Sequence, residues 1–128
     1  MEKNKDEKNV EPTRSELEIL QVLWAHGPST VRFVNDELCK QKDVNYTTTL
    51  KLMQIMADKG ILTRDESRMK HVYSVAEDEQ ATKAHLLEKF VDALYKGSAS
   101  KLVLQLLGNR KTSAEELRAI KEMLNKLD

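Results

Sequence analysis

The sequence is poor in the residues and segments that mark several large classes of protein. Its single cysteine, Cys39, excludes an intrachain disulfide and a metal site built from several cysteines. No apolar run approaches the roughly 18 residues of a membrane-spanning helix. Residues 1–9 also lack the apolar core of a signal peptide. The sequence therefore predicts a cytoplasmic protein with no membrane insertion.

Catalytic and metal-binding patterns are missing as well. The chain has no glycine-rich loop for phosphate and no paired nucleophile and base. Its three histidines, His26, His71 and His85, are far apart and lack the spacing of metal ligands. We accordingly expect no enzyme, no catalytic residues, no cofactor and no metal.

The charge balance excludes a broad basic surface. The 21 Lys and Arg are matched by 21 Asp and Glu, whereas a nucleic-acid-binding domain usually carries a basic footprint. Contact with nucleic acid must then depend on where a few basic residues lie. With 40% apolar and 33% charged residues among 128, the composition predicts one small helix-rich domain, or such a domain with an appendage.

Residues 45–75 contain the most informative pattern. Leu50, Met53 and Ala57 repeat at helical spacing and predict an amphipathic helix over residues 46–59, which Gly60 can end. A strand, a charged turn over residues 65–70 and a second strand follow. A helix with a short polar face followed at once by a hairpin is typical of a winged helix on DNA, in which the helix enters the major groove and the hairpin contacts the backbone.

Two further helices precede this segment. Thr13 and Glu16 have the spacing of a capping box and begin the first helix, which Gly27 and Pro28 end. Ser29 or Thr30 can cap the second. Three helices and two strands in this order predict an N-terminal winged helix-turn-helix over residues 11–76, after a disordered tail over residues 1–10.

The last part of the chain, residues 77–128, predicts three short helices with more apolar residues than they can bury alone. Two copies could cover these side chains, so we expect a helical dimerisation region and a homodimer. The fold class is therefore mostly α with a small β-hairpin. The expected dimerisation residues are Leu87, Phe90, Leu94, Leu102, Leu106, Leu117, Ile120 and Leu124.

The candidate DNA-binding residues come from the polar helix face, the hairpin and two helix starts. Hydroxyl and amine groups on the helix can bond base edges or phosphates. The alternative is a solvated helix face on which Thr47 and Thr48 act as caps, but the hairpin that follows favours DNA. The candidates are Thr47, Thr48 and Lys51 on the helix, Asn45 and Tyr46 at its start, Arg68 and Lys70 in the hairpin, and Arg14 and Arg32 near two helix starts.

With these residues in hand, the chain resembles the penicillinase repressor (BlaI/MecI/CopY) family of bacterial regulators from residue 12 to residue 128. The matching motifs are SELEILQVLW at 15–24, GPSTVR at 27–32, YTTTL at 46–50, KGIL at 59–62 and VYS at 72–74. The resemblance implies a homodimeric repressor in which each winged helix reads half of a palindromic double-stranded DNA operator.

Two departures from the family pattern concern induction. In the β-lactam branch an upstream membrane sensor system cleaves an Asn-Phe bond, and this chain has Gln105 and Leu106 there. This replacement argues against a sensor-protease partner. The copper branch has a C-terminal cysteine cluster, which is missing after Cys39. Two other functions stay open, namely a winged-helix protein-interaction module and a repressor switched by a small ligand between the C-terminal helices.

Overall fold

The computed structural model describes residues 11–67, 69–108 and 113–126. In these ranges the chain forms six helices and a two-stranded antiparallel hairpin. It divides into two compact units, and the boundary in the sequence falls between Lys83 and Ala84. The expected tail over residues 1–10 and the hairpin residue Arg68 lie outside the described residues. No helix in the described ranges has both the length and the apolar character needed to cross a membrane.

Helix α2, Arg14–His26, begins and ends where its local sequence predicts. The Thr13 hydroxyl accepts a hydrogen bond from the Glu16 backbone N–H, and the Glu16 carboxylate accepts one from the Thr13 N–H. This reciprocal pair satisfies two amide donors that would otherwise lack partners. Gly27, at φ 83°, ends the helix in a conformation that side chains disfavour.

Helices α3, Val31–Leu38, and α4, Tyr46–Asp58, form the helix-turn-helix. Thr30 caps α3 by accepting a hydrogen bond from the Phe33 N–H, which decides between the two predicted caps. Asn45 occupies the capping position of α4, but its side chain makes no capping hydrogen bond. The first turn of α4 therefore keeps unsatisfied backbone donors.

The hairpin consists of β1, Leu62–Asp65, and β2, Val72–Val75, paired in antiparallel register from Leu62 opposite Val75 to Asp65 opposite Val72. Ser29 adds a bridge that the sequence did not predict. Its N–H and C=O each bond to Tyr73, at 3.0 and 2.8 Å. This bridge attaches the outer edge of β2 to the chain between α2 and α3, so the hairpin has a fixed base.

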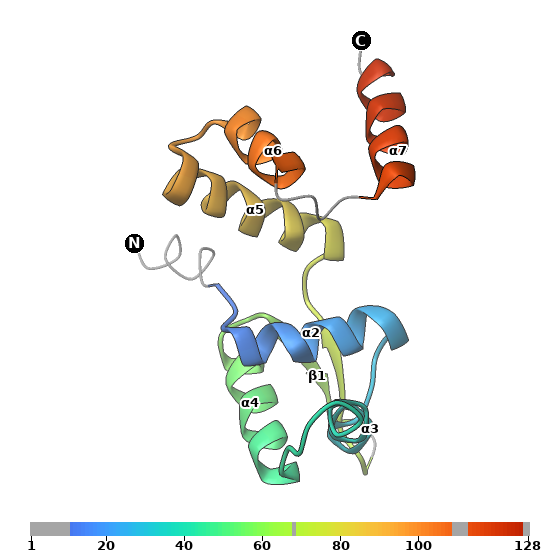
Figure 1. Ribbon diagram of the computed structural model, residues 1–128. Helices are drawn as coiled ribbons and strands as arrows, with labels where there is room; N and C mark the ends of the chain where they lie inside the picture. Colours follow the sequence, from blue (N-terminus) through green and yellow to red (C-terminus); the bar gives the residue numbers. More distant parts are fainter. Residues whose placement is uncertain (1–10, 68, 109–112, 127–128) are drawn as a thin grey trace, which may run out of the picture. The chain divides into compact units, whose positions relative to one another are not determined.

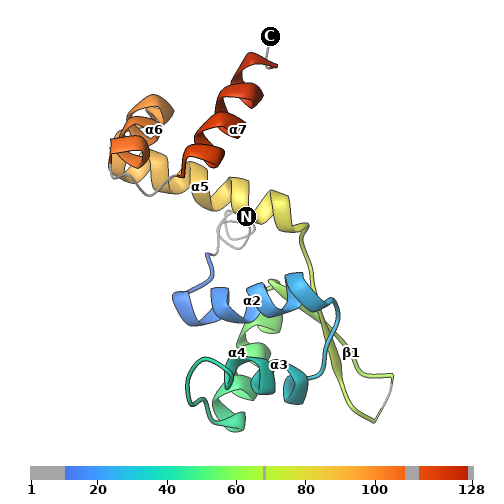
Figure 2. The same cartoon turned by 45° about the vertical axis from the view of Figure 1, so that its right-hand side comes forward.

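The core of this first unit lies where the three helices meet the base of the hairpin. Helix α2 lies across one end of α4 and the base of the hairpin (Figure 1), and Figure 2 shows the hairpin running away from the helices toward its tip. Burial of these apolar side chains is the main term that stabilises the unit. The buried cluster consists of Ile19, Leu20, Leu23, Val31, Val34, Met53, Met56, Leu62 and Tyr73.

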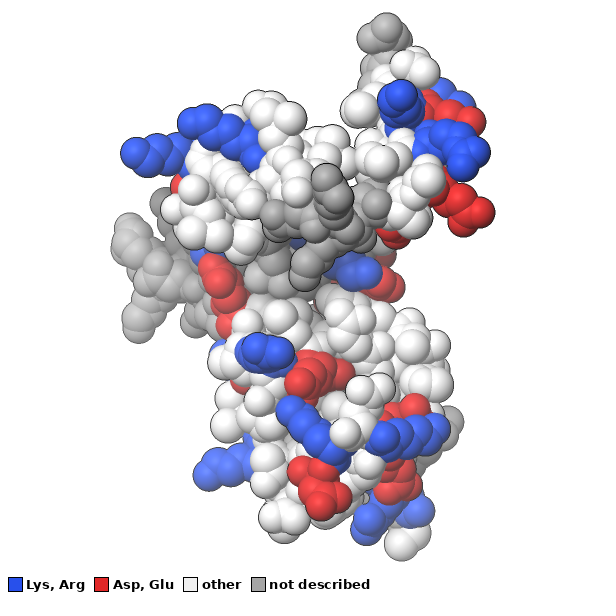
Figure 3. Space-filling view, in the orientation of Figure 1, with Lys and Arg blue, Asp and Glu red and all other residues white. Residues whose placement is uncertain are grey.

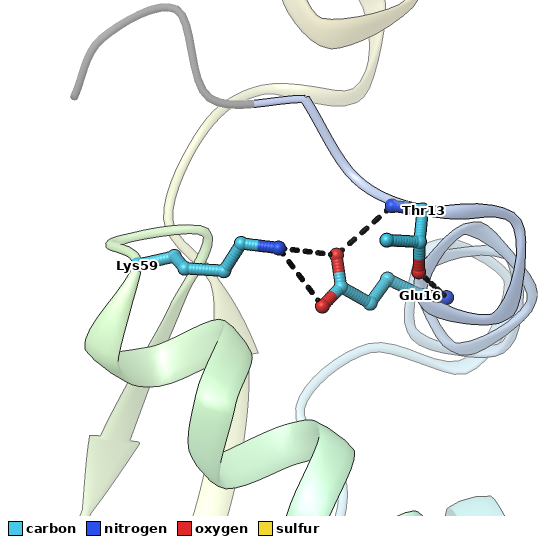
Figure 4. A network of polar contacts seen from close by, with 3 residues as sticks. All are labelled: Thr13, Glu16 and Lys59. Carbon is cyan, nitrogen blue, oxygen red and sulfur yellow. Dashed lines mark hydrogen bonds and ion pairs between the residues drawn. The ribbon is translucent and has the colours of Figure 1, made fainter. Parts of the chain in front are cut away.

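A partly buried ion pair joins the start of α2 to the end of α4. The Lys59 ammonium lies 2.8 and 3.0 Å from the two carboxylate oxygens of Glu16, while one of those oxygens also accepts the Thr13 N–H (Figure 4). Glu16 is almost fully buried. A buried carboxylate requires such partners, because its desolvation is costly when it is left unpaired.

The second unit contains most of α5, Glu79–Tyr95, together with α6, Ala99–Gly108, and α7, Ala114–Asn125. Ser113 and Glu116 form the predicted capping box of α7. Among the described residues of this unit, only Val91 is a buried hydrophobic side chain. Three helices that bury one apolar side chain among themselves do not make an independent core.

Candidate nucleic-acid interface

The outer face of α4 presents hydroxyl, amine and amide groups to solvent. Thr47, Thr48, Lys51 and Gln54 are all exposed, as the helical pattern predicted. Thr49 stands between them in sequence but is completely buried, and its hydroxyl donates a hydrogen bond of 2.7 Å to the Asn35 carboxamide. This contact between α3 and α4 fixes the rotation of α4, and thereby which of its side chains face outward.

A hollow of about 380 Å³ lies between the start of α3, the first turns of α4 and the hairpin. It brings together three predicted DNA-binding residues, Arg32, Tyr46 and Lys70, from three different elements. His71 and Gln54 also line it, and neither is among the DNA-binding residues predicted from the sequence. Gln54 belongs to the polar face of α4, so helical spacing could have predicted it as a contact. His71 lines the hollow only because the hairpin folds beside α4, which the sequence pattern does not predict.

Arg32 is held over the ring of Tyr46. Its guanidinium carbon lies 4.4 Å from the ring centroid, a cation–π geometry in which the charge stays accessible to solvent. The stacking orients a basic group beside the uncapped first turn of α4. A phosphate at this place would meet both a guanidinium and free backbone N–H groups.

A second hollow of about 530 Å³ lies on the other side of that first turn, between α2 and the loop before α4. Asn45 and Thr48 line it, together with Ser15 and Lys42. Arg14 is the exposed first residue of α2 and lines neither hollow. The structure therefore brings Arg32, Tyr46 and Lys70 to the first hollow and Asn45 and Thr48 to the second, while Arg14, Thr47 and Lys51 line neither.

Ion pairing separates the basic residues of the first unit into two sets. From residue 11 to residue 83, five of the described Lys and Arg side chains lie within 4 Å of a carboxylate. They are Lys40 with Glu37, Lys42 with Glu18, Lys59 with Glu16, Arg64 with Glu66, and Lys83 with Glu79. The other four described cations form no ion pair, and they are the predicted DNA-binding residues Arg14, Arg32, Lys51 and Lys70.

This distribution explains how a chain of zero net charge can still present cations to a polyanion. On the face of the first unit drawn in Figure 3, blue and red atoms alternate and form no continuous basic field. Most positive charge is cancelled locally by a neighbouring acid. The Lys40 hydrogen bond, for example, is the main cause that lowers the pKa of Glu37. The side chains that can still contact a polyanion are the Lys and Arg residues that form no ion pair.

The wing cation Arg64 belongs to the paired set. Its Nε lies 2.5 Å from Glu66, and its Nη1 donates to the Tyr73 hydroxyl at 3.5 Å. The hydrogen bond with Tyr73, and then the charge of Glu66, raise the pKa of Arg64 above its ordinary value. Both contacts keep the guanidinium on the hairpin itself.

The predicted dimerisation residues lie on three separate helices of the C-terminal part of the chain. Leu87, Phe90 and Leu94 are exposed on α5, at 47 to 62% of their surface, and Leu106 is exposed on α6 beside Gln105. Leu102 is half-buried. Exposed side chains of this kind are uncommon in such number on one small unit. The predicted dimerisation residues on α7, Leu117, Ile120 and Leu124, are exposed as well.

A helix-turn-helix followed by a hairpin, with hydroxyls and unpaired cations on the second helix and the hairpin, defines a winged-helix DNA-binding protein. A family model described as penicillinase repressor matches residues 12–126. This match covers most of the chain, which therefore belongs to the penicillinase repressor family, a family of transcriptional repressors.

Three curated relatives show the same similarity over nearly the whole chain. The methicillin resistance regulatory protein MecI of Staphylococcus aureus (strain N315) is 25% identical over 121 residues, which cover 94% of this chain and 98% of the relative. The MecI protein of Mammaliicoccus sciuri is 24% identical over the same shares. The penicillinase repressor of Bacillus licheniformis is 27% identical over 113 residues, 86% of each chain.

Proposed function

We propose that this chain is a cytoplasmic homodimeric repressor that occupies a palindromic DNA operator, with one winged helix on each half-site. The distribution of ion pairs carries this proposal. Arg32, Lys51 and Lys70 have no carboxylate partner, although acids neutralise every other described cation of the first unit except Arg14. Lys and Arg side chains that form no ion pair, on α4 and around the hollow beside it, are what a surface that binds DNA phosphates requires.

Each element of the interface has a proposed role. Thr47 and Thr48 contact base edges from the exposed face of α4, since hydroxyls bond to bases and threonine methyls touch the methyl group of thymine. Lys51 contacts a base or a phosphate from the next turn. The remaining candidates hold the backbone, which sets the register of the protein on the duplex. They are Asn45, Tyr46 and Arg32 around the first turn of α4, Lys70 and Arg68 in the hairpin, and Arg14 at the start of α2.

The homodimer is proposed from the exposed apolar residues of α5, α6 and α7. A second copy of the same helices would bury them through a two-fold interface, in which the same surface is used twice. Two winged helices would then be tethered to one operator, and the second half-site would be bound at high effective concentration. Occupation of the operator represses transcription by excluding the polymerase.

Selection of duplexes from a randomised pool tests this function directly. The full-length protein should enrich an inverted repeat whose half-sites are separated by about one helical turn or a multiple. A matched selection with Thr47→Ala/Thr48→Ala should lose the enriched bases but keep salt-dependent binding to DNA. Failure of the natural chain to enrich any sequence, at salt concentrations where it stays folded, would contradict the proposed function.

A further inference from the structure

Arg64 lies on β1, and its ion-pair partner Glu66 follows two residues later, just after the strand. Side chains two residues apart on a strand point to the same face, and cross-strand partners do so as well. Arg64 is paired with Tyr73, and Tyr73 and His71 line the hollow that we propose as a phosphate seat. Arg64 donates to the Tyr73 hydroxyl and so lies next to a residue that lines this hollow, although neither Arg64 nor Glu66 lines it.

The contacts of Arg64 show what keeps it from acting as a phosphate contact. The Glu66 carboxylate lies 2.5 Å from its Nε, and the Tyr73 hydroxyl accepts from its Nη1. The Glu66 side chain is 51% exposed, and that of Arg64 is 34% exposed. A carboxylate oxygen and a phosphate oxygen bind a guanidinium in the same way. Glu66 thus occupies a position on Arg64 that a phosphate oxygen could also take.

We propose that Glu66 is an intramolecular phosphate mimic that limits the affinity of the wing for the DNA backbone. It cancels the charge of Arg64 and also places a negative charge where a phosphate approaches. Both effects weaken binding to every duplex alike, because backbone contacts carry no sequence information. Stable occupancy then depends on the base contacts of α4, which only the operator supplies. This inference rests on the proposed function and adds a device that regulates it.

Glu66→Gln tests the inference by removing the charge while keeping the shape of the side chain. Binding of the full-length variant to a duplex without an operator should become about three- to tenfold tighter at ~0.1 M salt, as expected for one added phosphate contact. The slope of log affinity against log salt should steepen by about 0.9. Glu79→Gln is the matched control, because it also removes one acid from an ion pair, the one with Lys83 on α5. Its slope should equal that of the natural chain.

A second pair of variants tests the part played by Arg64. Arg64→Gln alone should weaken binding to every duplex, because it leaves the charge of Glu66 without its partner. In the double variant Arg64→Gln/Glu66→Gln, the gain of Glu66→Gln should be lost. Persistence of the full gain in the double variant, or an equal gain in Glu79→Gln, would overturn the inference. Salt-dependent binding by the natural chain in these same experiments would leave the proposed function standing, so the two failures are distinguishable.

Discussion

Thr49 of α4 donates a hydrogen bond of 2.7 Å to the carboxamide oxygen of Asn35 on α3, and both side chains are buried. This bond is a specific polar link inside the helix-turn-helix, in addition to the apolar contacts of the core. It fixes the rotation of α4 about its own axis, so it decides that Thr47 and Thr48 face outward. Thr49 is thereby a positioning residue for the proposed base contacts.

Thr49→Val should destabilise the protein by about 1–3 kcal/mol, because it keeps the shape of the side chain but leaves the buried Asn35 oxygen without a donor. Thermal or urea unfolding followed by circular dichroism measures this loss. Thr48→Val is the control, since its side chain is exposed and should change the free energy of unfolding by less than about 0.5 kcal/mol. Equal effects at the two positions would argue against a role for the Asn35 bond.

Lys59→Met should cost about 2–3 kcal/mol, because it leaves the buried Glu16 carboxylate without its counter-charge. Adding Glu16→Gln should restore part of this loss, since glutamine can still accept the Thr13 N–H of the capping box. Lys42→Met, which breaks the exposed pair with Glu18, should cost less than about 1 kcal/mol. A Lys59 variant as stable as the Lys42 variant would show that the buried pair contributes little.

Lys51→Ala and Lys70→Ala should each weaken binding to all duplexes and reduce the salt slope by about one, if each cation neutralises one phosphate. Lys40→Ala serves as control, because Lys40 is already paired with Glu37 and should leave the slope nearly unchanged. Fluorescence anisotropy over a salt series measures the slopes. Equal slopes for the Lys40 and Lys70 variants would remove the distinction between paired and unpaired cations.

Thr48→Ala should weaken operator binding by about 1–3 kcal/mol while the melting temperature stays constant, since the residue is exposed and proposed to contact a base. Thr63→Ala removes another exposed threonine, on β1, and should leave operator affinity unchanged. Operator affinity and melting temperature are measured on the same preparations. Unchanged affinity in the Thr48 variant would exclude this residue from base contact.

Leu106→Glu combined with Leu124→Glu should give a folded monomer, because both side chains are exposed in the single chain and a charge would be tolerated only in water. Sedimentation at micromolar concentration should show a dimer for the natural chain and a monomer for this variant. Ser100→Glu adds an acid to α6 at a polar, exposed position and should stay dimeric. A natural chain that sediments as a monomer would contradict the proposed dimer.

The sequence by itself determined the elements whose signals are local. The capping residues Thr13 and Ser113, the glycine ends of α2 and α4, and the hairpin of residues 62–75 all follow from hydrogen bonds or backbone preferences within a few residues. Helical periodicity also placed Thr47, Thr48 and Lys51 on an exposed face. The domain boundary at residue 76 and the dimerisation region stay predictions.

Only the tertiary structure decided which polar residues are paired across the fold. Thr48 and Thr49 are identical and adjacent, yet one is exposed and the other is buried against Asn35, 14 residues away. Lys59 finds Glu16 at a separation of 43 residues. The helical period rotates neighbouring residues by roughly 100°, but the partner that a side chain then meets belongs to another helix. The pairs of Lys59 with Glu16 and of Lys42 with Glu18 therefore depend on packing between distant segments, whereas those of Lys40, Arg64 and Lys83 join residues within four positions of each other.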